Sequence, residues 1–237
     1  MKLLFDNAFA PLTFKWGFVD ASVEAVTRAY RRWQRRILHT VKTTSVDLPL
    51  AQAIELLPPL DMGSQRVLFL GTKSAWTACF DNGARGGNPA TFVGELSHQI
   101  HCQAVACTCI PDTLTRATAR TPGTWGAVQF TLFGPDARGP MNVVRSVAAS
   151  HDVGGWEFNT RGVPQPFEQV DRYSSVRIAD RFTPEMLDDY CRALGIHCFD
   201  PGFYGGPGVL TSSRPWFLPR SKTVTLAEAR RHFGLPP

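Results

Sequence analysis

Side chains that could exchange protons with a substrate lie near one another in the sequence. Asp81 begins the glycine-rich loop Asp81–Asn88, and His98 and His101 follow it along the chain. A carboxylate and an imidazole can serve as general base and general acid. Loops at the end of a rigid pair of strands often carry binding residues. Asp81, His98 and His101 are therefore candidate catalytic residues of a hydrolase or transferase.

The same stretch also contains side chains that bind metal ions. His98 and Cys102 are four residues apart, a spacing that puts two side chains on one face of a helix. Zinc binds imidazole and thiolate, but the spacing with His101, Cys107 and Cys109 fits none of the usual zinc patterns, and the chain has no Cys-x-x-Cys. We expect no metal and no other cofactor, and His98 and Cys102 remain the candidates if a metal does bind.

A run of arginines has clear helical spacing. Its members are Arg28, Arg31, Arg32, Arg35 and Arg36, beside an apolar stripe of Val23, Val26, Tyr30, Trp33 and Ile37. Such a face is most often simply hydrated, but it could also bind an acidic partner or a phosphate backbone. Both aromatic residues among the arginines belong to the apolar stripe, so stacking on bases is poorly supported. We expect a protein partner rather than nucleic acid.

Further candidate binding residues lie in loops. Asp81, Asn82 and Arg85 belong to the glycine-rich loop, where an arginine could hold an anion. Aromatic residues near glycine and proline would form a partner patch if they were exposed. These aromatics are Trp156, Phe158, Phe167, Phe203, Tyr204, Trp216 and Phe217. We take Trp156 and Tyr204 from this set as binding candidates. Carboxylates and arginines of residues 157–181, such as Glu168, are expected to form surface ion pairs.

Periodicity and capping signals predict the elements that carry these residues. Strands are expected at Leu12–Val19, Thr43–Val46, Val67–Leu70, Ala75–Phe80, Gln103–Ile110, Trp125–Phe133, Asn142–Ala149 and Gly154–Thr160. Helices are expected after Asp20 or Ser22, at Pro49–Leu57, at Pro89–Ile100, after Thr183 and after Thr225. Phe199–Gly208 is expected to be a loop. Together these predict a single α+β domain over residues 1–237, with a mixed or largely antiparallel sheet and flanking helices.

The composition excludes some classes of protein. Apolar residues make up 43% and charged residues 19%, which argues against a disordered chain. The net charge of +5 is weak evidence for nucleic-acid binding. The apolar run Leu3–Phe5 is shorter than a signal peptide needs, and no stretch approaches the roughly 18 apolar residues of a membrane span. We expect a cytoplasmic protein without membrane contact, whose six cysteines are reduced.

Familiar catalytic motifs are missing from the sequence. It contains neither Gly-x-Ser-x-Gly nor the phosphate-binding Gly-x-x-x-x-Gly-Lys-Ser/Thr. The segment Trp76–Gly83, with the sequence WTACFDNG, resembles a segment of uncharacterised bacterial proteins, which implies a bacterial origin. As a type, a small α/β protein without catalytic motifs also resembles the immunity proteins that neutralise bacterial toxins. The leading hypothesis is therefore a bacterial immunity or antitoxin protein that occludes its partner. The alternative is an enzyme with an acid/base site near Asp81 and His98.

Overall fold

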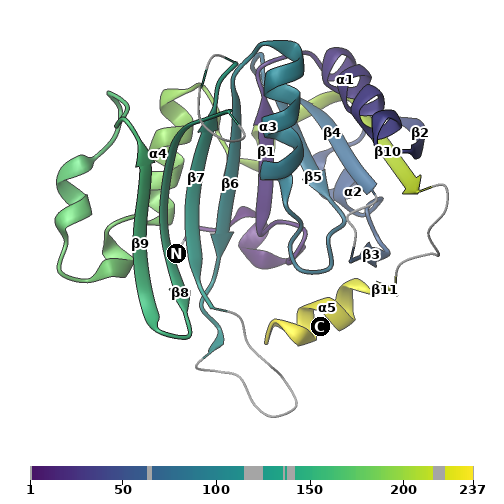
Figure 1. Ribbon diagram of the computed structural model, residues 1–237. Coiled ribbons are helices and arrows are strands. Elements are labelled where there is room, and N and C mark those ends of the chain that lie inside the picture. The colour runs from purple at the N-terminus through teal and green to yellow at the C-terminus, as the bar shows by residue number, and fades with distance from the viewer. Residues whose placement is uncertain are drawn as a thin grey trace.

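A computed structural model describes residues 2–62, 66–114, 125–135, 137, 142–215 and 222–236. Most of this chain forms one antiparallel sheet with helices on both faces (Figure 1). Within the described residues the strand order is β2-β10-β4-β5-β1-β6-β7-β8-β9. The strands are β1 (Lys15–Val19), β2 (His39–Val46), β4 (Arg66–Thr72), β5 (Thr77–Asp81), β6 (Ala104–Ile110), β7 (Ala127–Phe133), β8 (Val143–Asp152), β9 (Gly155–Gly162) and β10 (Tyr204–Pro215). A separate two-stranded ribbon pairs β3 (Leu60–Asp61) with β11 (Thr223–Val224).

One face of the sheet carries two helices, α1 (Val23–Arg36) and α3 (Pro89–Ile100). Their shared core centres on Tyr30, whose ring lies 5.2 Å from that of Phe69 and 6.0 Å from that of Phe92. Helix α3 packs close to β1 because Gly17 has no side chain there. A Cβ atom at Gly17 would lie 2.7 Å from Val93 Cγ1. Apolar burial on this face therefore fixes α1 and α3 relative to the sheet.

The opposite face carries the larger part of the core. Helices α2 (Leu50–Ile54) and α4 (Pro184–Ala193) pack there with the N-terminal segment, while α5 (Leu226–His232) lies beside the small ribbon (Figure 1). The central strands β1, β4, β5 and β6 are therefore covered on both faces and are almost entirely buried. All six cysteines are free in the structure, and all except Cys102 are buried.

The local signals in the sequence predicted most of these elements. The α+β class, the hairpin of β4 and β5, and the meander β7–β9 are all present. Helix α3 has the predicted bounds, and Thr183 caps α4 by accepting a hydrogen bond from the Met186 N–H. The predicted capping box of α5 is formed by Thr225 and Glu228. The predicted aromatics Trp216 and Phe217 lie outside the described residues.

Two predictions about strands were wrong. Phe199–Gly208, expected to be a loop, contains the start of β10, which lies between β2 and β4. The strand expected at Leu12–Val19 starts at Lys15, because residues 9–14 form turns closed by the bonds Leu12 N–H to Phe9 O and Phe14 N–H to Pro11 O. Apolar alternation before Lys15 thus reflects buried turn residues rather than a strand.

Among the described residues, no helix combines the length and the apolar character that crossing a bilayer would require.

Candidate functional site

Helix α1 is held on the sheet by one side, which leaves its other side free for contact. The Ser22 side chain caps the helix by accepting a hydrogen bond from the Ala25 N–H at 3.3 Å. Val26 and Tyr30 are buried against the sheet and α3. The arginines alternate with these apolar residues at helical spacing, so burial of one stripe directs the other stripe outward.

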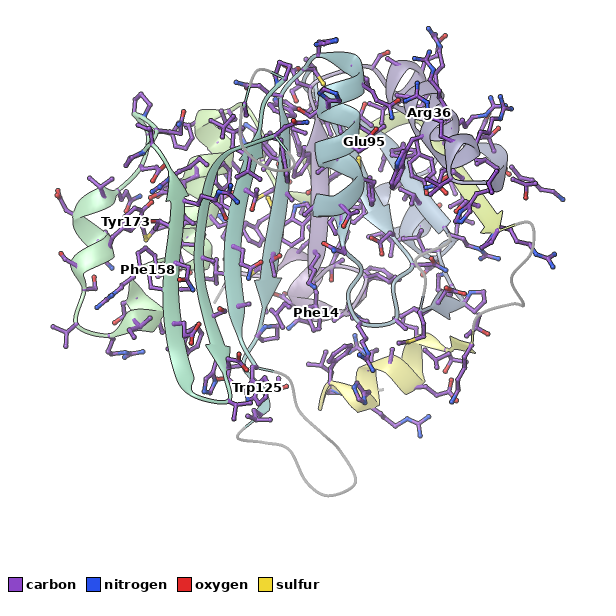
Figure 2. The ribbon with its side chains drawn as sticks, viewed as in Figure 1. Phe14, Arg36, Glu95, Trp125, Phe158 and Tyr173 are labelled. Carbon is purple, nitrogen blue, oxygen red and sulfur yellow. The ribbon has the colours of Figure 1, made fainter. Side chains whose placement is uncertain are left out.

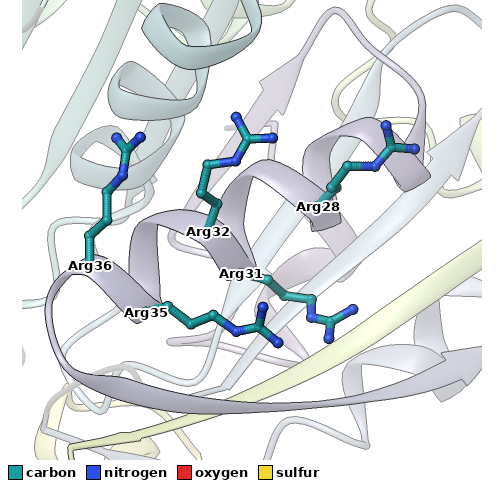
Figure 3. A pocket seen from close by; sticks show the side chains of 5 residues that line it. All are labelled: Arg28, Arg31, Arg32, Arg35 and Arg36. Carbon is teal, nitrogen blue, oxygen red and sulfur yellow. The ribbon is translucent and has the colours of Figure 1, made fainter.

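We call the outward stripe the arginine face; its members are Arg28, Arg31, Arg32, Arg35 and Arg36. These five side chains line a surface hollow of about 450 Å³ (Figure 3). Arg28 forms an ion pair with Glu24, one turn earlier on the same helix. The other four arginines form no ion pair within the described part of the chain, and the buried Nε of Arg31 has no hydrogen-bond partner there. The face therefore presents several guanidinium groups without counter-charges.

Like charges at this spacing oppose one another. Pairs four residues apart, such as Arg28 with Arg32 and Arg32 with Arg36, each destabilise a helix by about 0.2–0.5 kcal/mol. Arg35 and Arg36 recover part of this cost because cations are favourable in the last turn of a helix. A carboxylate-bearing surface placed against the arginine face would remove the repulsion and accept paired hydrogen bonds from the guanidinium groups.

A groove continues the arginine face toward the edge of the sheet. It has a volume of about 600 Å³ and runs between α1 and the paired strands β2 and β10. Thr27, Arg28 and Arg31 line it on the helix side, and Ser45 and Gly208 line it on the strand side. Strand β2 is the end strand of the described sheet and is mostly exposed. A partner lying on α1 would therefore also reach this groove and a strand edge.

The structure gives Asp81 a part in holding the glycine-rich loop. Its side chain is buried, and its carboxylate oxygens accept hydrogen bonds from the N–H groups of Gly83 at 2.8 Å and Asn88 at 3.1 Å. Gly87 passes so close that a Cβ atom on it would lie 2.0 Å from Asp81 Oδ1. Arg85 is exposed in the same loop. Asp81 thus fixes the turn that leads into α3.

Asp81 and His98 are not brought together. Asn88, which Asp81 contacts, directly precedes α3, whereas His98 lies nine residues after Pro89, about 14 Å further along the helix axis at 1.5 Å per residue. His98 and His101 are exposed, with ring centroids 6.3 Å apart. This geometry does not support the acid/base pairing that the enzyme alternative requires.

His98 and Cys102 do not share a helix face, because Cys102 lies beyond the end of α3. The helix ends at Ile100, and His101 has a left-handed backbone with φ of 57°, so the chain turns away before Cys102. Burial, followed by the charge of Asp20, raises the pKa of the Cys102 thiol to about 11. A protonated thiol is a poor metal ligand. No group of three or more metal-binding side chains occurs among the described residues.

Asn82 and Tyr204 lie inside the protein rather than on a binding surface. The Asn82 amide donates a hydrogen bond to Pro59 O and accepts one from the Arg66 N–H, both at 2.8 Å. The Tyr204 ring is buried, and its hydroxyl donates a hydrogen bond to Cys198 O at 2.6 Å. The prediction of an exposed Tyr204 was wrong because β10 turns this side chain into the core.

Trp156 takes part in a cluster that the sequence did not reveal. Its ring stacks on that of His151 with centroids 5.4 Å apart and planes 9° apart. His151 Nδ1 lies 2.7 Å from an oxygen of Asp112, so the carboxylate fixes the orientation of the imidazole. The signal for half of this cluster was present, since His151 and Trp156 are register partners across the hairpin of β8 and β9. Nothing in the sequence indicated Asp112.

A buried ion pair was also missed. Glu168 was expected at the surface, but both of its oxygens accept hydrogen bonds from Arg145, at 2.8 and 2.7 Å, and both side chains are almost fully buried. The Tyr173 hydroxyl donates a further hydrogen bond to Glu168 at 2.7 Å. Figure 2 places Tyr173 beside β9, far from Arg36 on α1. This network fastens residues 165–173 to the sheet and is separate from the arginine face.

Among the predicted binding residues, the five arginines of the arginine face are the ones that lie together on one surface. Its five residues project from one helix, form one hollow and adjoin an open groove. No family model, curated protein or solved structure matches this chain.

Proposed function

We propose that this protein binds an acidic protein partner through the arginine face and neutralises that partner by covering its functional surface. The class of function is that of a bacterial immunity or antitoxin protein acting in the cytoplasm. The observation that carries the proposal is the set of four arginines without counter-charges on one rigid helix. Uncompensated guanidinium groups favour carboxylates, which they bind with two parallel hydrogen bonds.

A protein partner is favoured over nucleic acid by the placement of the aromatic residues of α1. Tyr30 is buried, and Trp33 is half-buried with its ring edge-to-face against Tyr30 at 5.8 Å. Single-stranded nucleic acids are usually bound by aromatic rings exposed between basic residues. The arginine face offers charge and hydrogen-bond donors without such a platform, which suits a carboxylate-rich protein surface.

The surroundings of the arginine face support the proposal of occlusion. The arginine face continues into the groove that β2 and β10 form with α1, so a partner can contact charged, polar and backbone groups at once. Buried arginines often act as hot spots at the centre of an interface. The helix is held by the core through Val26 and Tyr30, so its backbone needs little reordering on binding.

The test is affinity capture from a lysate of the native host, with mass spectrometry of the retained proteins. The test variant reverses two charges on the arginine face, Arg32→Glu and Arg35→Glu. The matched control reverses two exposed arginines on distant elements, Arg161→Glu and Arg172→Glu. We expect the wild type and the control to retain one partner in stoichiometric amount, and the test variant to lose it.

Two outcomes would contradict the proposal. Equal retention by the test variant would mean that the arginine face is not the contact surface. Retention that nuclease treatment abolishes, with a steep loss on adding salt, would indicate nucleic acid as the partner.

A further inference from the structure

A second concave site lies beside α1, on the side away from the arginine hollow. It has a volume of about 290 Å³ and opens between the C-terminal half of α1, the start of α3 and the sheet. Its apolar lining consists of Trp33, Ile37, Met62, Val67 and Phe92. Its polar lining consists of Tyr30, Gln34, His39, Asp81, Asn88, Thr91 and Ser213. The size is close to the lower end of the range for small-molecule pockets, and the wall combines apolar side chains with polar groups that could orient a ligand.

Two residues that line this pocket, Gln34 and His39, each have a buried polar atom without a hydrogen-bond partner among the described residues. Gln34 is 5% exposed, and its Oε1 atom makes no hydrogen bond there. A buried acceptor without a donor is unfavourable, because the group has lost water and gained nothing in return. A ligand that brings an N–H group to Gln34 would restore the missing bond.

His39 limits the charge that the pocket can accept. Its Nδ1 atom is buried without a hydrogen-bond partner among the described residues, and burial lowers the pKa of its imidazole. The ring is therefore neutral at pH 7 and offers one donor and one acceptor. Asp81 contributes a carboxylate to the wall, and neither lysine nor arginine lines the pocket. An anionic ligand is disfavoured by this combination.

Tyr30 contributes a polar hydroxyl to the pocket but no group that could act as a catalytic base. Burial raises the pKa of its hydroxyl to about 12, and that hydroxyl already bonds to the side chains of Ser213 and Thr211. It cannot serve as a base at neutral pH. The pocket is suited to holding a molecule rather than transforming it.

The rim of the pocket is apolar and exposed. Ile37 and Met62 are 46% and 52% exposed, and both line the opening. Inside, Trp33 and Phe92 offer aromatic surface, which packs well against a flat ring. A planar ligand would cover the exposed apolar rim while its donor reaches Gln34.

We propose that this pocket binds a small, neutral, planar heterocycle that carries an N–H donor, with Gln34 Oε1 as the acceptor that recognises it. The inference is independent of the acidic partner, since none of the five arginines lines the pocket.

The test uses indole as the probe and 1-methylindole, which lacks the N–H, as its matched comparison. Binding is followed by ¹⁵N-resolved chemical shifts of the full chain. We expect indole to bind about tenfold more tightly than 1-methylindole, equivalent to about 1.4 kcal/mol. The shifted amides should belong to α1, the start of α3 and β10.

Gln34→Leu should bring the affinity for indole down to that for 1-methylindole. Gln99→Leu is its control, because Gln99 also has an unpartnered Oε1 on a helix but lies outside this pocket. Met62→Ala, at a position that is exposed at the pocket rim, should weaken both probes equally. This variant keeps the test valid if Gln34→Leu fails to fold. Equal affinity of the two probes for the wild type, no response up to several millimolar indole, or shifts confined to another region would each overturn the proposal.

Discussion

Replacing Gly87 with alanine tests whether the Asp81 carboxylate fixes the glycine-rich loop. Gly87 has φ of 68°, and a Cβ atom there would lie 2.0 Å from Oδ1 and 2.4 Å from Cγ of Asp81. The carboxylate cannot turn away without breaking its bonds to the N–H groups of Gly83 and Asn88. Gly87→Ala must therefore displace either the loop or the carboxylate.

The expected loss of stability follows from these contacts. A left-handed backbone costs an alanine about 1 kcal/mol, and each hydrogen bond to a charged group contributes at least about 1.5 kcal/mol. Losing both bonds and adopting the strained backbone amounts to about 4 kcal/mol. In a domain of this size, that corresponds to a fall in Tm of about 8–16 °C.

The assay is urea denaturation with thermal melting as a second measure. Gly154→Ala is the control, because nothing lies within 4 Å of a Cβ atom there; it should change stability by less than about 0.5 kcal/mol. In an Asp81→Ala background the clash is gone, so Gly87→Ala should then cost only about 1 kcal/mol. A Gly87→Ala cost below about 1 kcal/mol, or simple additivity of the two changes, would refute the proposed role of Asp81.

Three other substitutions have clear expected outcomes. Glu168→Gln removes one charge of a buried ion pair and should lower the free energy of unfolding by about 3–5 kcal/mol, whereas exposed Glu157→Gln should have little effect in the same denaturation assay. Burial raises the pKa of Glu168, but hydrogen bonds from Arg145, Gln165 and Tyr173 outweigh this and hold it below its usual value. The stability that ionised Glu168 contributes is therefore present above its unfolded pKa of about 4.3 and is lost as pH falls through its folded pKa. Acid titration should accordingly lower the free energy of unfolding of the wild type more than that of Glu168→Gln. Arg32→Gln removes two like-charge contacts and should stabilise the protein by about 0.4–1 kcal/mol at low salt, and by less at high salt. The same variant should weaken partner capture. A loss of stability in thermal melts would count against repulsion between the arginines of α1. Thr183→Ala removes the cap of α4 and should cost about 1 kcal/mol in urea denaturation, and an unchanged midpoint would show that the cap adds nothing.

The elements that the sequence predicted well are those with local signals. Helix α3 begins at a proline, and α4 begins with Thr183 followed by a proline and ends near Gly195. These residues act within a turn of the helix that they begin or end, so no distant contact is needed to interpret them. The arginine face was visible for the same reason, because helical spacing depends only on neighbouring residues.

Strand β10 was missed because its glycines are required by contacts with a distant strand rather than by a local turn. Tyr204–Gly208 contains three glycines and a proline, which is typical of a loop. In the structure, a Cβ atom at Gly208 would lie 2.8 Å from Phe69 O on β4, so glycine there permits close approach of two strands. The other glycines of this segment lie where the register of β10 against β4 shifts, between Tyr204 and Gly208. The sequence carries no mark that separates this use of glycine from a turn.

Contacts between distant residues account for the errors in the candidate site. Glu168 meets Arg145 across 23 residues, and Asp112 meets His151 across 39. Tyr204 points inward because it pairs with β4 and packs into the larger core cluster. Periodicity assigns such residues to a face of their own element, but it does not show what packs against that face.

The position of β10 has a consequence for how the protein is made. Strand β4 is synthesised more than 130 residues before β10, its neighbour in the finished sheet. At 5–20 residues per second, the ribosome needs roughly 7 to 26 s to supply that neighbour. During this interval the apolar residues Val67–Leu70 lie on an open strand edge, the kind of edge that pairs with other chains. We therefore expect products truncated before residue 204 to aggregate through this open edge.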